Sequence, residues 1–144
     1  MIRTFVAIEL TVAARIALEA VQDHLRRGKG GRAGRWVRKE GIHLTLKFLG
    51  DVPEEKLEAV YRAVHRACEG CPPFAVTLAR LGCFPDIRRP RVLWVGIQEQ
   101  TGQLVALQRA IDHELGALGF PSEQRAFRPH LTLARIRKKA ERGE

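Results

Sequence analysis

Residues 43–46 read His-Leu-Thr-Leu, and residues 130–133 repeat the same four residues in the same order. The first tetrad lies in a segment with the composition of a β-strand, 42–49, and the second begins one residue before another such segment, 131–136. Because successive side chains of a strand point to opposite faces, the leucines of each tetrad share one face and its histidine and threonine share the other. The repeat therefore indicates an internal, diverged duplication, with the leucines in a core and the polar pair at a surface or cleft.

Two histidines and two threonines on one concave surface would suit chemistry at phosphorus. Imidazole titrates close to neutral pH, so one ring serves as a general acid and the other as a general base. The hydroxyls of Thr45 and Thr132 then donate hydrogen bonds to phosphoryl oxygens. A metal site is the weaker hypothesis, because neither strand places an aspartate or glutamate beside His43 or His130 on that face.

Strands and helices are interspersed along the whole chain. Helices are expected after a cap at Thr11, from Pro53 to about Gly70, and from a cap at Thr101 to Gly119. Strands are expected at 4–10, 42–49, 74–81, 91–97 and 131–136. The pattern predicts an α+β fold of antiparallel or mixed sheets with helices outside, and no linker divides it. We therefore expect a single, internally duplicated domain over residues 1–144.

The charge of the chain favours a polyanionic ligand. Lysine and arginine number 25 against 16 acidic residues, a net charge of +9, and 19 of the 25 are arginine. Such an excess suits nucleic acid or an anionic membrane surface. The glycine-rich basic segment 26–35 is either a solvated connector or an arm that contacts RNA through Arg32 and Arg35. No apolar stretch is long enough for a membrane span or a signal peptide, so a cytoplasmic protein is expected.

Several residues near the motifs have two possible roles. Trp36 and Phe127 either stack on a terminal base or belong to the core. Phe48 falls on the leucine face of its strand and is expected in the core, whereas Lys47 shares the face of His43 and is a candidate phosphate contact.

The cysteines and the remaining histidines are weaker candidates for a site. His65, Cys68 and Cys71 have the spacing of zinc ligands, with Cys83 as a conceivable fourth. Cys68 also continues the apolar stripe of a helix, and we favour that interpretation. The other histidines outside the tetrads, His24 and His113, are expected on helices as surface or packing residues.

With these motifs in place, the chain resembles the 2H phosphoesterase superfamily. Within it the chain is most similar to the bacterial and archaeal RNA 2′,3′-cyclic phosphodiesterases, also called 2′-5′ RNA ligases. The matching segments cover the start of the chain, the first tetrad with its flanks and the second tetrad with its flanks, which are residues 3–10, 35–37, 43–50 and 127–135.

The resemblance implies two pseudo-symmetric lobes, each presenting one tetrad to a central basic cleft. It implies hydrolysis of RNA 2′,3′-cyclic phosphate ends to 2′-phosphates, without a metal or other cofactor. Family assignments make His43 the proton donor and His130 the proton acceptor. They place Thr45 and Thr132 on the non-bridging oxygens, and Arg135 matches an arginine that assists phosphate binding, although strand parity would put it on the leucine face.

The partners that follow are RNAs with 2′,3′-cyclic phosphate ends, such as tRNA halves. A 5′-hydroxyl that replaces water in the same geometry would join two RNA ends through a 2′-5′ bond. A monomer that does not bind membranes is expected. Two alternatives stay open, which are a non-catalytic module that binds RNA ends and a phosphodiesterase of small cyclic nucleotides.

Overall fold

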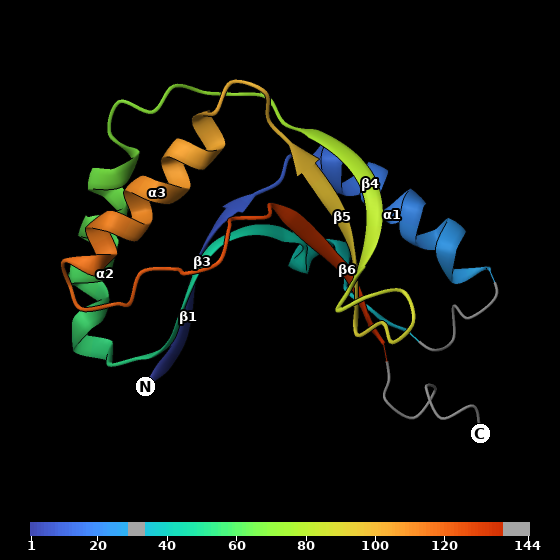
Figure 1. Cartoon of the computed structure of the whole chain (residues 1–144), viewed down its shortest axis with the longest axis horizontal. Coiled ribbons are helices and arrows are strands. Elements are labelled where there is room, and N and C mark those ends of the chain that lie inside the picture. Colours follow the sequence, from blue (N-terminus) through green and yellow to red (C-terminus); the bar gives the residue numbers. More distant parts are fainter. Residues whose placement is uncertain (29–33, 137–144) are drawn as a thin grey trace. The chain divides into compact units, whose positions relative to one another are not determined.

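The computed structural model describes residues 1–28 and 34–136 (Figure 1). Arg32 and the charged tail from residue 137 lie outside the described residues. The elements are β1 (Ile2–Glu9), α1 (Val12–Arg26), β2 (Gly34–Trp36), η2 (Lys39–Gly41), β3 (His43–Val52), η3 (Glu54–Lys56), α2 (Leu57–Cys68), β4 (Thr77–Phe84), β5 (Val92–Gln98), α3 (Gln103–Gly116) and β6 (His130–Ile136). Helices are interspersed with antiparallel strand pairs, which confirms the predicted α+β class.

The helix starts follow local sequence signals. The Thr11 hydroxyl accepts a hydrogen bond from the Ala14 N–H at 3.1 Å, which confirms the predicted cap of α1. The predicted cap of α3 is wrong by one residue, because the helix begins after Gly102. Gly102 has a φ of 86°, a conformation that glycine adopts without steric cost.

The contacts divide the chain into two compact units, which are described separately. Unit 1 comprises Met1–Ile8, Thr45–Thr77 and Gln98–Pro129, and unit 2 comprises Glu9–Leu44, Leu78–Ile97 and the chain from His130 onward. The units are not the two sequence halves that the duplication suggested. Helix α1 from the first half is in the same unit as β6, which carries the second tetrad.

Unit 1 combines a two-stranded sheet with two helices. Strands β1 and β3 pair with each other, and α2 and α3 lie side by side (Figure 1). The helices bury the apolar stripe formed by Val60, Ala63, Ile111 and Leu115. At the surface, Arg66 of α2 donates a hydrogen bond to the carboxylate of Glu114 on α3 at 3.0 Å. Burial of the stripe is the main stabilising contribution, since an exposed ion pair adds little.

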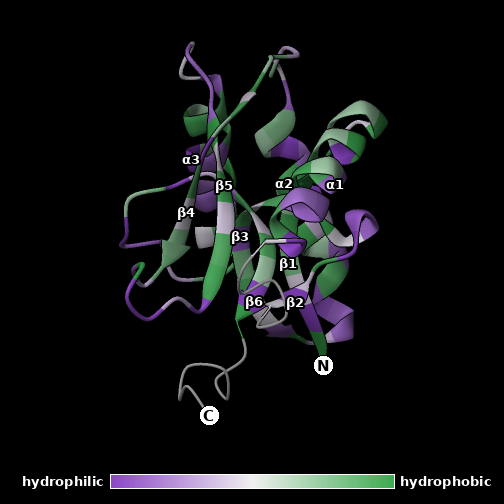
Figure 2. Ribbon diagram, turned by 90° about the vertical axis from the view of Figure 1, so that its right-hand side faces the viewer, coloured by the Kyte–Doolittle hydropathy of each residue, from purple (hydrophilic) through white to green (hydrophobic). Residues whose placement is uncertain are grey.

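Unit 2 is built on a four-stranded sheet in the order β2-β6-β5-β4. The central strand β6 is antiparallel to both β2 and β5. Strand β5 is drawn mostly in the hydrophobic colour, in keeping with its place inside the sheet (Figure 2). Leu131 and Leu133 of the second tetrad are fully buried. Leu44 and Leu46 of the first tetrad are at most 5% exposed. The predicted leucine face of both tetrads is therefore confirmed.

A β-bulge interrupts β6 in the middle of the sheet. Trp94 of β5 pairs with Thr132, but the preceding Leu93 pairs with Ala134, so Leu133 is the extra residue. The Leu133 carbonyl accepts hydrogen bonds from the Val37 N–H at 2.9 Å and from Nε2 of Gln22 at 3.0 Å.

Gln22 connects three segments of unit 2 at this bulge. Its side-chain Nε2 also donates to the Val37 carbonyl at 2.7 Å, and the residue is only 3% exposed. One amide group of α1 thus satisfies two backbone carbonyls that the bulge and the end of β2 would otherwise leave underpaired.

The bulge changes which face later residues occupy. After it, Ala134 is buried and Arg135 is exposed, the reverse of simple alternation. Strand β3 has the same burial sequence, since Lys47 is buried at 6% exposure and Phe48 is 68% exposed. The predictions that Lys47 shares the face of His43 and that Phe48 lies in the core are therefore wrong, because the alternation shifts after the tetrad.

Replacing Gln22 with methionine should destabilise the protein. Methionine keeps much of the side-chain length but leaves the Val37 carbonyl without its donor, at a cost of about 1–3 kcal/mol for a buried polar group. Chemical denaturation measures the free energy of unfolding directly.

The matched control is Gln100→Met, at an exposed glutamine of the same chain. It should change the free energy of unfolding by no more than about 0.5 kcal/mol. Equal stability of the two variants would show that the bonds of Gln22 do not hold the bulge.

Candidate active site

Three residues of β6 share the open face of the sheet in unit 2. His130, Thr132 and Arg135 pair with Gly96, Trp94 and Val92, which are alternate residues of β5. Because alternate residues of an uninterrupted strand point to one face, and paired residues point the same way, the three β6 side chains do so too. The bulge thus brings Arg135 to the face of His130, which removes the conflict between strand parity and a role in phosphate binding.

A second arginine lies next to Arg135. The register between β2 and β6 places Arg35 directly opposite Arg135, and both are exposed. Like charges at opposed positions repel each other, so this pair is unfavourable unless an anion lies between them. The structure thus brings together Arg35 and Arg135, two of the predicted basic contacts.

Trp36 points away from this face. It pairs with Ala134, which is buried, so its side chain lies on the opposite side of the sheet. There the guanidinium of Arg26 on α1 lies 5.5 Å from the Trp36 ring centroid. A base held on the open face would not reach Trp36 in this position, and the residue is half-buried and not part of the buried core, so its role stays a prediction.

Two aromatic side chains surround the imidazole of His130. The Phe84 ring lies 5.1 Å away, centroid to centroid, at 90°, and the Trp94 ring lies 6.1 Å away. Phe84 and Trp94 also contact each other at 5.1 Å. A Cβ atom at Gly82 would overlap the Trp94 indole, so glycine is required there for the tryptophan to occupy this position.

The first tetrad is half-buried at its polar positions. His43 belongs to unit 2, as His130 does, whereas Thr45 belongs to unit 1.

Lys47 is not available to a ligand in the way predicted. Its ammonium, 4% exposed, forms an ion pair with Asp112 and donates to the Pro121 carbonyl at 2.8 Å. It anchors β3 to α3 and the segment after it.

The remaining aromatic candidates lie in unit 1. Phe127, the second predicted base contact, is half-buried in the segment before β6. Phe48, expected in the core, instead makes an exposed pair with Phe5, at a ring separation of 6.1 Å.

Neither the predicted core position of Cys68 nor the alternative zinc site with His65 is found. Cys68 is exposed at the end of α2, so its assignment to the apolar stripe is wrong. His65 stacks on Tyr61 at 6.4 Å, and Cys83 belongs to the other unit. Within residues 1–28 and 34–136, no three histidine, cysteine or acidic side chains are arranged to hold a metal ion.

Sequence reasoning missed the residues that surround and support His130. Phe84 and Trp94 belong to strands β4 and β5, and their proximity to His130 follows from strand order and register. Gln22 was missed as well, although a glutamine on the apolar side of an amphipathic helix is a signal of a buried hydrogen bond.

In the part of the chain that the structure covers, no helix is long and apolar enough to cross a bilayer.

Known proteins share this architecture. A model of the family described as LigT like Phosphoesterase matches residues 8–94 and 95–143. An RNA 2′,3′-cyclic phosphodiesterase of Thermotoga maritima is 36% identical over 136 residues, which are 94% of this chain and 70% of the relative.

Solved structures agree with the sequence match. The crystal structure of a Thermus thermophilus protein superposes with a TM-score of 0.80 at 31% identity, covering 94% of this chain and 74% of that one. Escherichia coli LigT complexed with 3′-AMP gives a TM-score of 0.75 at 30% identity and the same coverage. The repeated His-Leu-Thr-Leu tetrad, the α+β fold and these matches show that the chain belongs to the LigT-like phosphoesterase family.

Proposed function

We propose that the protein hydrolyses 2′,3′-cyclic phosphate ends of RNA to 2′-phosphomonoesters. The observation that carries the proposal is the open face of unit 2, where His130, Thr132 and Arg135 point the same way. That face offers a proton acceptor, a hydroxyl donor and a cation to one phosphoryl group. The name of the Thermotoga maritima relative supports the same substrate class.

The reaction is an in-line displacement at phosphorus. His130 accepts a proton from water as the oxygen attacks, and His43 donates a proton to O3′ as the P–O3′ bond breaks. Thr45 and Thr132 donate hydrogen bonds to the non-bridging oxygens, where negative charge increases in the transition state. Arg135 neutralises part of that charge, and Lys47 has no direct part because its ammonium is occupied by Asp112.

RNA is the proposed substrate polymer. The net charge of +9 and the opposed Arg35 and Arg135 favour a polyanion that extends beyond one phosphate. A 5′-hydroxyl in place of water would give 2′-5′ joining, but water is far more abundant, so hydrolysis comes first. A monomeric, cytoplasmic protein of one domain that acts on tRNA halves stays a prediction.

The direct test is incubation of an RNA that ends in a 2′,3′-cyclic phosphate with the protein in excess chelator. Because imidazoles serve as acid and base, a 2′-phosphate end should form at the same rate with and without chelator. End-group analysis identifies the product. Loss of activity in chelator with rescue by a divalent ion would overturn the metal-free mechanism, and turnover of cyclic mononucleotides alone would favour a small-nucleotide enzyme.

Replacing Thr132 or Thr45 with valine should slow hydrolysis without unfolding the protein. Each variant keeps the branched shape of the side chain but loses one hydroxyl donor. Removal of a donor to a developing oxyanion typically lowers kcat by roughly 10²- to 10³-fold. Steady-state kinetics on the cyclic phosphate substrate measures the effect.

Thr77→Val is the control, since Thr77 is exposed at the start of β4. It should leave kcat unchanged. Wild-type turnover in Thr132→Val and Thr45→Val would remove the threonines from the mechanism.

A further inference from the structure

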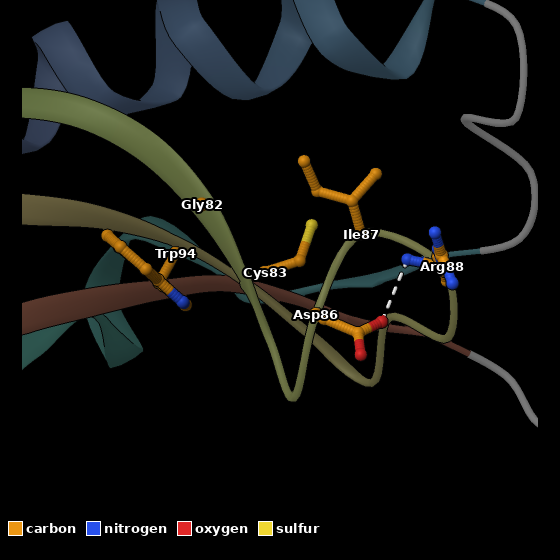
Figure 3. Close-up of a pocket in the computed structure, with 6 residues that line it drawn as sticks. All are labelled: Gly82, Cys83, Asp86, Ile87, Arg88 and Trp94. Atoms are coloured by element: carbon orange, nitrogen blue, oxygen red, sulfur yellow. Dashed lines mark hydrogen bonds between the residues drawn. The ribbon is translucent and has the colours of Figure 1, made fainter.

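A pocket of about 550 Å³ opens in unit 2 where β4 ends and its following loop begins (Figure 3). It is lined by Gly82, Cys83, Asp86, Ile87, Arg88 and Trp94. The volume falls within the range of roughly 300–1,000 Å³ found for small-molecule sites. The proposed hydrolysis uses none of these residues.

The pocket begins next to the proposed base. Its wall includes Trp94, which pairs with Thr132 across the sheet. The ring centroid of Trp94 lies 6.1 Å from that of His130. A molecule in the pocket that contacts Trp94 would therefore lie close to His130 and to the place proposed for the phosphoryl group.

The lining matches the chemistry of a nucleotide. Trp94 and Ile87 offer an aromatic and an aliphatic surface to a flat base, and base–aromatic stacking is tolerant of sequence. Arg88 adds a cation suited to a phosphate.

The loop that carries Ile87 and Arg88 is held in shape by Asp86. Its Oδ1 atom accepts hydrogen bonds from the backbone N–H groups of Arg88 at 2.9 Å and Arg89 at 3.0 Å (Figure 3 shows the first). Both arginine side chains are exposed, and together they outweigh the single negative charge of Asp86, so this loop carries a net positive charge. A nucleotide with a further phosphate on its 3′ side fits that charge.

The in-line geometry of the reaction indicates which nucleotide would occupy the pocket. In an in-line displacement the nucleophile and the leaving oxygen lie on opposite sides of phosphorus. The ribose of the cyclic phosphate carries the leaving O3′, so its base and the rest of that strand lie on the leaving side. His130 contacts the nucleophile if it is the proton acceptor, and the pocket beside it then lies on the nucleophile's side.

We propose that this pocket binds the first nucleoside of a second RNA, whose 5′-hydroxyl replaces water as the nucleophile. The inference rests on the proposed function and adds to it a site for the RNA that is joined. The 5′-oxygen forms a bond to phosphorus, its proton passes to His130, the P–O3′ bond breaks and O3′ takes a proton from His43. The product is a 2′,5′-phosphodiester, and no other reactant is needed.

The test compares joining with hydrolysis in the same full-length protein. Ile87→Asp and Arg88→Ala change exposed pocket side chains, and Ile16→Asp and Arg38→Ala are exposed matched controls outside the pocket. The 5′-hydroxyl RNA is titrated against a cyclic-phosphate RNA, and both products are quantified. The pocket variants should raise the half-saturating concentration of 5′-hydroxyl RNA roughly tenfold, a typical loss for one stacking or phosphate contact.

Hydrolysis of a 2′,3′-cyclic mononucleotide should be unchanged in all four variants. If the wild type hydrolyses this substrate but joins no 5′-hydroxyl RNA at any concentration, or if the pocket variants join as well as the controls, the pocket proposal is wrong. Equal loss of hydrolysis and joining would place the cyclic-phosphate strand in the pocket and would also overturn it. Failure of the wild type to hydrolyse would instead contradict the proposed function.

Discussion

The hydrogen bond from Gln22 to the Leu133 carbonyl holds the feature on which the candidate site depends. Leu133 is the extra residue of the β6 bulge, and without that extra residue Arg135 would turn toward the buried side of the sheet. With it, an arginine joins His130 and Thr132 on the open face. The same side chain closes the end of β2, which carries Arg35 to its place opposite Arg135. A helix amide of α1 thus helps to set which charges face a phosphate.

In both tetrad strands the alternation of buried and exposed residues shifts after the tetrad, but different contacts stabilise the two strands. In β6 the residue after the tetrad is Ala134, which fits against the sheet without a polar group to satisfy. In β3 the corresponding residue is Lys47, whose buried ammonium requires the carboxylate of Asp112. A buried charge is tolerated only when it is paired, so Lys47 and Asp112 function together as a structural pair. One duplicated strand is therefore supported by hydrogen bonds to the Leu133 carbonyl from Gln22 and Val37, and the other by an ion pair.

Local signals in the sequence were sufficient for the fold class and for the polar face of each tetrad. The helix cap at Thr11 and the buried Leu131 and Leu133 follow from side-chain chemistry and strand period alone. The face of Arg135 could not be read in this way, because a bulge depends on the partner strand and strict alternation assumes there is none. The burial of Lys47 could not be read either, because it depends on the carboxylate of Asp112 on α3. The proximity of Phe84 and Trp94 to His130 depends on strand order, which a single sequence does not display.

His43 as the general acid and His130 as the general base are tested most directly by a substrate with an activated aryl leaving group. Such a phosphodiester needs no proton on its leaving oxygen, but its attacking water still needs a base. The activity of His43→Ala, relative to wild type, should therefore recover on the aryl substrate compared with the cyclic phosphate, while His130→Ala stays inactive on both. Recovery of His130→Ala in place of His43→Ala would reverse the two roles, and recovery of neither would contradict the assignment of one acid and one base.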